Sequence, residues 1–128
     1  MQKLSMNQKF NVPKNASYFR KSDAEETFER LDHPKSFYEL SEEQRKQLLE
    51  WCSGMETIKR PNPHHTSYGL KHWFEASEGG FYVTNGQFKG AMILSGYSVA
   101  NPDALNWTFN ISQASYKEKR SQLKRLPI

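Results

Sequence analysis

The sequence has few of the features that mark membrane proteins, disulfide-stabilised domains or enzymes. Its single cysteine cannot form an internal disulfide, which is compatible with a reducing compartment. No apolar run approaches the length of a membrane span, and the start, MQKLSMNQKF, lacks the apolar centre of a secretory signal. We therefore expect a cytoplasmic protein with no membrane association, and its 128 residues suit one domain.

Catalytic and metal-binding patterns are also missing. The glycines match neither the P-loop nor the dinucleotide-binding spacing, and the four histidines and Cys52 do not have zinc-ligand spacing. Cys52 follows Leu48 and Leu49 at the end of an amphipathic stretch, which favours a small core residue over a nucleophile. We expect a protein that is not an enzyme and holds no metal or cofactor.

The positive charge lies at the two ends of the chain. Residues 1–22 carry +5, residues 23–50 carry −5, residues 51–114 are neutral and residues 115–128 carry +4. Basic ends favour polyanionic partners. The alternative is that these ends are only solvated, or that they fold back onto the acidic segment.

Four capping boxes predict helix starts, because in this motif a hydroxyl and a carboxylate or amide three residues later each accept an orphan backbone N–H. They pair Ser22 with Glu25, Ser41 with Gln44, Thr84 with Gln87, and Ser115 with Glu118. The predicted helices span about 23–32, 42–53, 85–95 and 115–125.

A fifth helix is predicted from Thr66 to Gly79-Gly80, with Thr66 or Ser67 as its cap. Before it, residues 59–65 contain two prolines and are predicted to form a loop. Residues 1–21 show no periodicity and are predicted to be mostly irregular.

Residues 105–111 alternate apolar and polar side chains, as a half-buried strand does. The short apolar run Phe81–Val83 is predicted to pair with Asn106–Ile111. The predicted fold class is α+β: a small, mostly helical domain with a short two-stranded antiparallel sheet and a helix-turn-helix-like centre. A basic arm (1–21) precedes this domain (22–114), and a basic helix or tail (115–128) follows it. The predicted core comprises Phe28, Leu31, Leu48, Leu49, Leu70, Trp73, Phe74, Phe88, Ala91, Met92, Trp107, Phe109 and Ile111.

The helix from Thr84 is a candidate recognition helix. It would present Asn85, Gln87 and Lys89 to a DNA groove, where amides can bond adenine and lysine can reach guanine or phosphate. Residues 77–83 are longer than the usual turn of about 3–4 residues, however, and Asn85 and Gln87 are equally explained as first-turn and capping residues.

Two further sets of residues have the chemistry of nucleic-acid binding. The run Tyr18, Phe19, Arg20, Lys21 combines aromatic rings with cations, as single-strand binders do, although the two rings could instead anchor the arm on the domain. The C-terminal helix could lie on phosphates, dock on an acidic partner or cover the core. Its cations are Lys117, Lys119, Arg120, Lys124 and Arg125.

The segment SYGLKHWFEASEGGFYVTNGQFKGAMILSGY, followed by LNW, resembles small accessory proteins of Gram-positive phages and integrated mobile genetic elements. The resemblance implies proteins that act on element DNA, on its replication machinery or on host defences. It assigns no catalytic or binding residue.

These patterns favour a non-enzymatic nucleic-acid-binding accessory protein, which binds single- or double-stranded DNA in replication or regulation of a phage or mobile element. The alternative is a protein-binding subunit or inhibitor of a polymerase, helicase or host-defence enzyme. This second hypothesis depends on the abundance of aromatic residues and on the separated charges.

Overall fold

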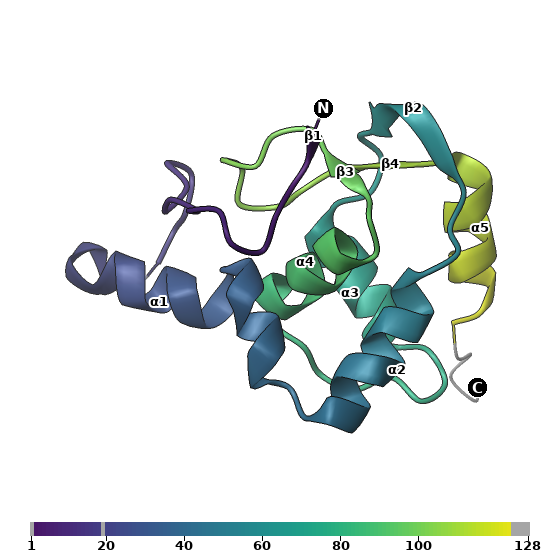
Figure 1. The fold of residues 1–128 in the computed structure, drawn as a ribbon, viewed down its shortest axis with the longest axis horizontal. Helices are drawn as coiled ribbons and strands as arrows, with labels where there is room; N and C mark the ends of the chain where they lie inside the picture. Colours follow the sequence, from purple (N-terminus) through teal and green to yellow (C-terminus); the bar gives the residue numbers. More distant parts are fainter. Residues whose placement is uncertain (1, 19, 124–128) are drawn as a thin grey trace.

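Helix α4 (Asn85–Leu94) runs through the centre of the protein, and other helices pack around it (Figure 1). The computed structural model describes residues 2–18 and 20–123. In α4 every residue except Gln87 and Leu94 is buried. The elements in contact with it are α1 (Ala24–Leu31), the 3-10 helix η2 (Pro34–Glu39), α2 (Glu42–Cys52) and α3 (Ser67–Glu75).

Two glycines of α4 permit the close approach of η2. A Cβ atom at Gly86 would lie 2.5 Å from the carbonyl oxygen of His33, and one at Gly90 would lie 2.4 Å from that of Pro34. Since these neighbours are backbone atoms, any side chain would push the two helices apart. The i, i+4 spacing of the glycines therefore defines the face of α4 that η2 covers.

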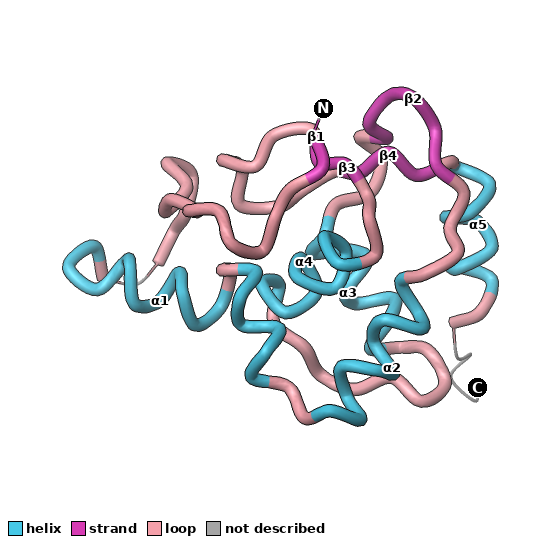
Figure 2. Tube along the Cα trace, in the orientation of Figure 1, coloured by secondary structure: helices cyan, strands magenta, loops and turns pink. Residues whose placement is uncertain are grey.

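The sheet has four antiparallel strands in the order β1-β3-β4-β2, and it lies along one side of the helices (Figure 2). The strands are β1 (Gln2–Lys3), β2 (Thr57–Asn62), β3 (Ser98–Val99) and β4 (Phe109–Ile111). The prediction of an antiparallel sheet in an α+β fold is confirmed, but its two-stranded form is wrong.

Two errors account for the incorrect sheet. Phe81–Val83 has no strand structure, and β4 pairs instead with β2 and β3. The predicted proline loop contains most of β2, because β2 is an edge strand and Pro61 can occupy it without removing an interior hydrogen bond. The expected alternation also fails in part, since Asn110 is buried and its Oδ1 accepts a hydrogen bond from the Ser98 amide at 2.8 Å.

Two of the four capping boxes are confirmed. Ser41 with Gln44 begins α2, and Thr84 with Gln87 begins α4. The other two are wrong, because α1 follows a short 3-10 helix, η1 (Lys21–Asp23), and α5 (Gln113–Ser121) begins earlier than predicted.

The true cap of α5 is Ser112, whose Oγ accepts a hydrogen bond from the Ser115 amide at 3.1 Å. Ser115 Oγ accepts instead from the Glu56 amide at 2.8 Å, which ties α5 to the start of β2. Thr66 is the N-cap of α3 but makes no side-chain capping bond, and the Oγ of Ser67 accepts from the Trp107 amide at 3.0 Å.

The predicted core is buried, apart from Leu31, Leu49 and Trp73, which are half-buried. The prediction missed buried apolar residues in irregular and 3-10 segments, in strand β3 and in the helices α4 and α5. These are Leu4, Met6, Phe10, Phe37, Leu40, Met55, Val83, Ile93, Tyr97, Val99 and Tyr116. Leu4, Met6 and Phe10 therefore belong to the core although their segment forms no helix. Among the described residues, none of the helices is long and apolar enough to cross a membrane.

Candidate functional site

A groove of about 450 Å³ lies where the end of α1 meets α3 and the segment that leads into α4. Most of its exposed lining surface is apolar, although six of its ten lining residues are polar or charged. Ligand sites often combine apolar walls with such polar groups. The residues used below are Asp32, Tyr68, Lys71, His72, Tyr82 and Asn106.

Two exposed tyrosines form the walls of the groove. Tyr68 of α3 is 52% exposed, and Tyr82, which lies between α3 and α4, is 71% exposed. The Lys71 Nζ atom lies 5.6 Å from the centre of the Tyr68 ring and 5.2 Å from that of Tyr82. The ammonium thus contacts both rings through cation–π attraction.

Glu75 fixes the position of this arrangement. Its Oε2 accepts hydrogen bonds from Lys71 Nζ at 3.1 Å and from the Val83 amide at 3.0 Å, while its Oε1 lies 3.0 Å from His72 Nδ1. One carboxylate therefore neutralises the buried Lys71 and attaches α3 to the segment that carries Tyr82.

The base of the groove is a hydrogen-bonded network around Asp32. Its carboxylate accepts from the Tyr18 hydroxyl at 2.5 Å and from Asn85 Nδ2 at 3.0 Å. Lys89 Nζ lies 3.4 Å from the Asp32 carbonyl oxygen and 4.6 Å from the centre of the Trp107 ring. Burial raises the pKa of Tyr18, and its hydrogen bond to Asp32 adds to this shift.

This network corrects the predicted recognition helix. Asn85 and Lys89 are buried, so they cannot reach a DNA groove. Gln87 is half-buried and its side chain accepts from the Thr84 amide in the capping box. The burial of α4 on nearly every side leaves no face for a helix-turn-helix contact, and residues 76–84 are longer than the turn of that motif.

A basic surface lies at the end of the protein where β2 and α5 meet. We define it by Lys59 and Arg60 of β2 and Lys117 and Arg120 of α5, all exposed. Among the described residues, no acidic side chain lies within ion-pair distance of these four cations. The Asn62 Nδ2 atom donates to Gln113 Oε1 at 3.2 Å, which holds β2 beside α5.

Lys119 has a different position from the other cations of α5. It is half-buried, with its Nζ 4.5 Å from the centre of the Trp51 ring, and burial lowers its pKa. Its contribution to the basic surface is therefore smaller than that of Lys117 or Arg120. Lys124 and Arg125, which were predicted to act with them, lie outside the described residues.

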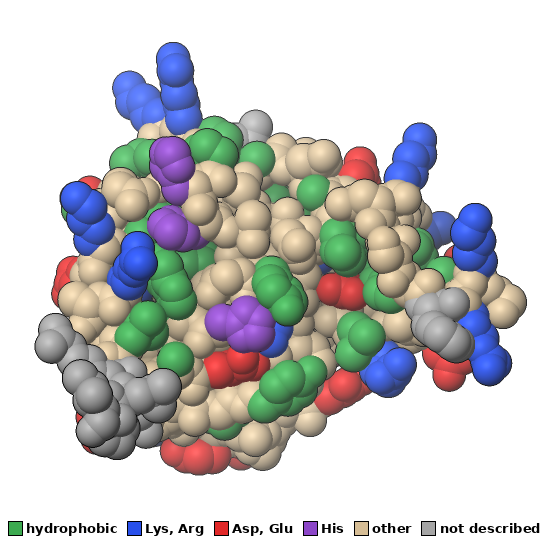
Figure 3. All heavy atoms as spheres, turned by 180° about the vertical axis from the view of Figure 1, so that it is seen from behind, with side chains coloured by type: hydrophobic (Ala, Val, Ile, Leu, Met, Phe, Trp, Pro, Cys, Tyr) green, Lys and Arg blue, Asp and Glu red, His purple; other side chains and the backbone are tan. Residues whose placement is uncertain are grey.

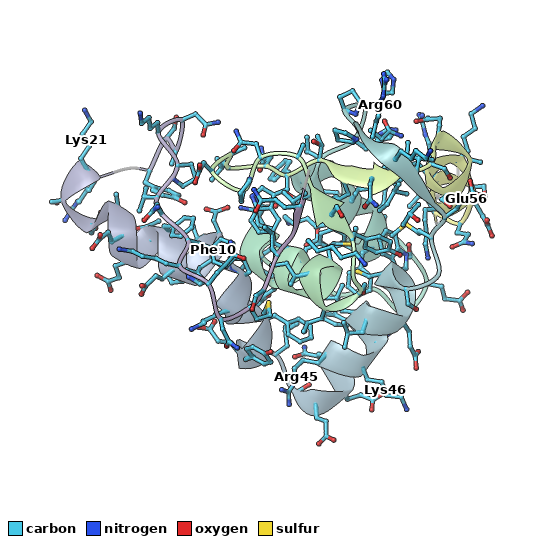
Figure 4. All side chains as sticks on the ribbon, turned by 45° about the horizontal axis from the view of Figure 1, so that its top comes forward. Phe10, Lys21, Arg45, Lys46, Glu56 and Arg60 are labelled. Atoms are coloured by element: carbon cyan, nitrogen blue, oxygen red, sulfur yellow. The ribbon has the colours of Figure 1, made fainter. Side chains whose placement is uncertain are left out.

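The N-terminal run is not part of the basic surface. Tyr18 is held by Asp32, and Phe19 lies outside the described residues. Arg20 and Lys21 are exposed at the start of η1. Lys21 and Arg60 lie toward opposite ends of the protein (Figure 4). The structure therefore separates the two predicted basic ends.

Helix α3 lines the groove and also contacts α5, because the rings of Trp73 and Tyr116 lie 6.2 Å apart. It lies behind α4 in Figure 1, so Figure 3, which shows the protein from behind, has the face that carries α3 at the front. On that face hydrophobic side chains lie around charged and histidine side chains near the middle, and Lys and Arg side chains project at the edge where β2 and α5 lie. One broad face therefore carries both the groove and the basic surface.

Sequence reasoning missed the groove and the two cations of β2. Tyr68, Lys71, His72 and Glu75 follow the i, i+3, i+4, i+7 spacing of one helix face, which is a detectable signal beside the apolar stripe of α3. Lys59 and Arg60 directly precede the prolines of a segment predicted to be a loop. Neither set lay in a segment with a strong net charge.

The described residues contain no group of three or more histidine, cysteine or acidic side chains arranged to hold a metal ion. Cys52 is fully buried, and burial raises the pKa of its thiol, so the thiolate form is disfavoured. Comparisons with protein-family models, with curated proteins and with solved structures found no match for this chain.

Proposed function

We propose that the protein is a non-enzymatic, cytoplasmic accessory protein that binds nucleic acid, in the replication or regulation of a phage or mobile genetic element. The observation that carries this proposal is the basic surface beside an aromatic groove on one face. Cations meet phosphates without sequence preference, and exposed rings offer a stacking surface for bases.

The state of the carboxylates supports binding rather than catalysis. Asp32 and Glu75 are the acidic residues at the groove, and each accepts hydrogen bonds from at least two neighbouring groups. Both therefore have a positioning role in the structure. The sequence resemblance to phage and mobile-element proteins supplies the proposed biological setting.

A matched pair of charge reversals tests this function. The variant Lys59→Glu/Arg60→Glu alters the basic surface, and Arg45→Glu/Lys46→Glu makes the same charge change on α2, away from Arg60 (Figure 4). We expect the β2 variant to weaken binding of a fluorescein-labelled DNA strand strongly, and the α2 variant to weaken it little. Equal weakening by both variants, or none by either, contradicts the proposed surface.

A second candidate function is protein binding, and a specific observation favours it. An apolar groove of about 600 Å³ lies between η2 and α2, where Tyr38 is 52% exposed and Leu94 is 45% exposed. Trp107 is buried and Trp51 and Trp73 are half-buried, so tyrosine and leucine, rather than tryptophan, would anchor such an interface. Chemical crosslinking of the full chain to candidate replication or defence enzymes, with Leu94→Asp as the disrupting variant, tests it.

A further inference from the structure

The charged side chains of the groove beside α3 are already paired or hydrogen-bonded within the protein. Lys71 is paired with Glu75 at 3.1 Å, and the same carboxylate lies 3.0 Å from His72 Nδ1. The Asp32 carboxylate accepts from Tyr18 and Asn85. A phosphate would therefore find no unpaired cation among the described lining residues, whereas a flat, uncharged group would lose little on entering.

The tyrosine walls suit a planar ring. Lys71 lies against one side of the Tyr82 ring, 5.2 Å from its centre, and 71% of this residue remains open to solvent. A ring with one face held by a cation and the rest exposed is preorganised for stacking, because it has few conformations to lose on binding. Tyr68, on the other wall, is edge-on to the His72 ring with centroids 4.6 Å apart, which restricts its rotation.

Polar groups in the groove can bond the edge of such a ring. Asn106 is exposed, and its Oδ1 accepts from Asn85 Nδ2 at 3.1 Å, which orients the amide. Its Nδ2 has no hydrogen-bond partner among the described residues and can donate to a carbonyl or ring nitrogen. His72 keeps its Nε2 available in the same way, because Nδ1 is engaged by Glu75.

We propose that this groove holds one base of a single-stranded nucleic acid, turned away from the neighbouring bases of its strand. The base stacks against the Tyr82 ring, with its hydrogen-bonding edge toward Asn106. The proposal rests on the function proposed above: the basic surface holds the phosphate backbone, and the groove takes a base from the same strand. Single-strand binders combine these two elements, and base–aromatic stacking tolerates different sequences.

The test uses the full chain and three fluorescein-labelled probes of about 12 nucleotides, within the usual site sizes of single-strand binders. The probes are an oligothymidine strand, a strand of the same length made only of abasic sugar-phosphates, and a duplex. We expect the oligothymidine to bind more tightly than the abasic strand. Tyr82→Ala should weaken oligothymidine binding by about 5- to 150-fold, the range that stacking of one base implies, and should leave the abasic strand and the duplex unchanged.

Two control variants make the result specific. Tyr82→Phe keeps the ring and should retain oligothymidine affinity, while Tyr38→Ala removes another exposed tyrosine, on η2, and should have no effect. If wild type binds the thymidine and abasic strands equally and Tyr82→Ala changes nothing, the base site is overturned while the proposed function stands. If wild type binds none of the three probes, the proposed function itself fails, and the base site fails with it.

Discussion

The ammonium of Lys89 lies inside the core, 4.6 Å from the centre of the Trp107 ring, and both residues are only 1% exposed. Lys89 is on the central helix α4, and Trp107 precedes strand β4, so the contact joins the helical layer to the sheet. The carbonyl oxygen of Asp32, 3.4 Å from Nζ, provides the other stabilising contact. A buried charge of this kind is tolerated because the ring and the carbonyl replace part of its hydration.

The pKa of Lys89 predicts a pH-dependent stability. Burial lowers this pKa to about 8, with the Asp32 charge opposing the shift, whereas an unfolded lysine has a pKa of about 10.4. Between these values the folded protein binds fewer protons than the unfolded chain, so the contribution of Lys89 to the free energy of unfolding rises with pH. From pH 7 to 9.5 wild type should gain about 2 kcal/mol relative to Lys89→Met, as measured by urea unfolding.

Comparing wild type with Lys89→Met also cancels the pH dependence that other titrating groups give to the free energy of unfolding. Tyr18, Tyr97, Tyr116 and Cys52 have raised pKa values and lower the stability as pH rises toward 10, but they do so in both proteins. Parallel stability curves for wild type and Lys89→Met would show that Lys89 has an ordinary pKa in the fold.

At two helical glycines we expect substitution by alanine to change the stability of the protein in opposite directions. Gly90→Ala places a methyl group 2.4 Å from the Pro34 carbonyl oxygen, so α4 and η2 must separate, at a cost of about 1–3 kcal/mol. Gly69→Ala, on α3, meets nothing within 4 Å and should stabilise the protein by about 0.5–1 kcal/mol through helix propensity. Thermal melting of both variants distinguishes close packing from propensity; a stabilised Gly90→Ala would contradict the observed approach of η2.

The pair Lys71–Glu75 predicts a coupling between substitutions. Glu75→Ala leaves the buried Lys71 ammonium without its carboxylate and the Val83 amide without its acceptor, and should lower the free energy of unfolding by about 1.5–3 kcal/mol. Adding Lys71→Met removes the stranded charge, so the double variant should be more stable than the sum of the two single changes predicts. Additive effects in a double-mutant cycle would show that the pair is not coupled.

The helices could be predicted from the sequence wherever a local signal defines their ends. Ser41 with Gln44 and Thr84 with Gln87 act within one helical turn, so their capping bonds depend little on the rest of the fold. The same signal failed at Ser115, because Ser112 offers an equivalent hydroxyl one turn earlier and Ser115 bonds Glu56 of a distant segment.

The sheet depends on partners far apart in the chain. Val99 pairs with both Gln2 and Phe109. The strands β1 and β3 have only two residues each, too few for a periodicity that a sequence pattern can detect. Asn85 and Lys89 were misjudged for a similar reason: polar residues on a helix suggest an exposed face, but Asp32, from another helix end, provides partners that allow their burial. The spacing along α3 groups Tyr68 with Glu75, but it does not show that Glu75 also bonds the Val83 amide and so brings Tyr82 into the groove.

The salt dependence of DNA binding by the full wild-type chain tests the central claim most directly. With Lys59, Arg60, Lys117 and Arg120 each meeting one phosphate of a single strand, the logarithm of the association constant should fall linearly with the logarithm of salt concentration, with a slope of about −2.8. Fluorescence anisotropy of a labelled strand at several salt concentrations measures this slope. A slope near zero, or no binding of single-stranded or duplex DNA at low salt, would contradict nucleic-acid binding through the basic surface.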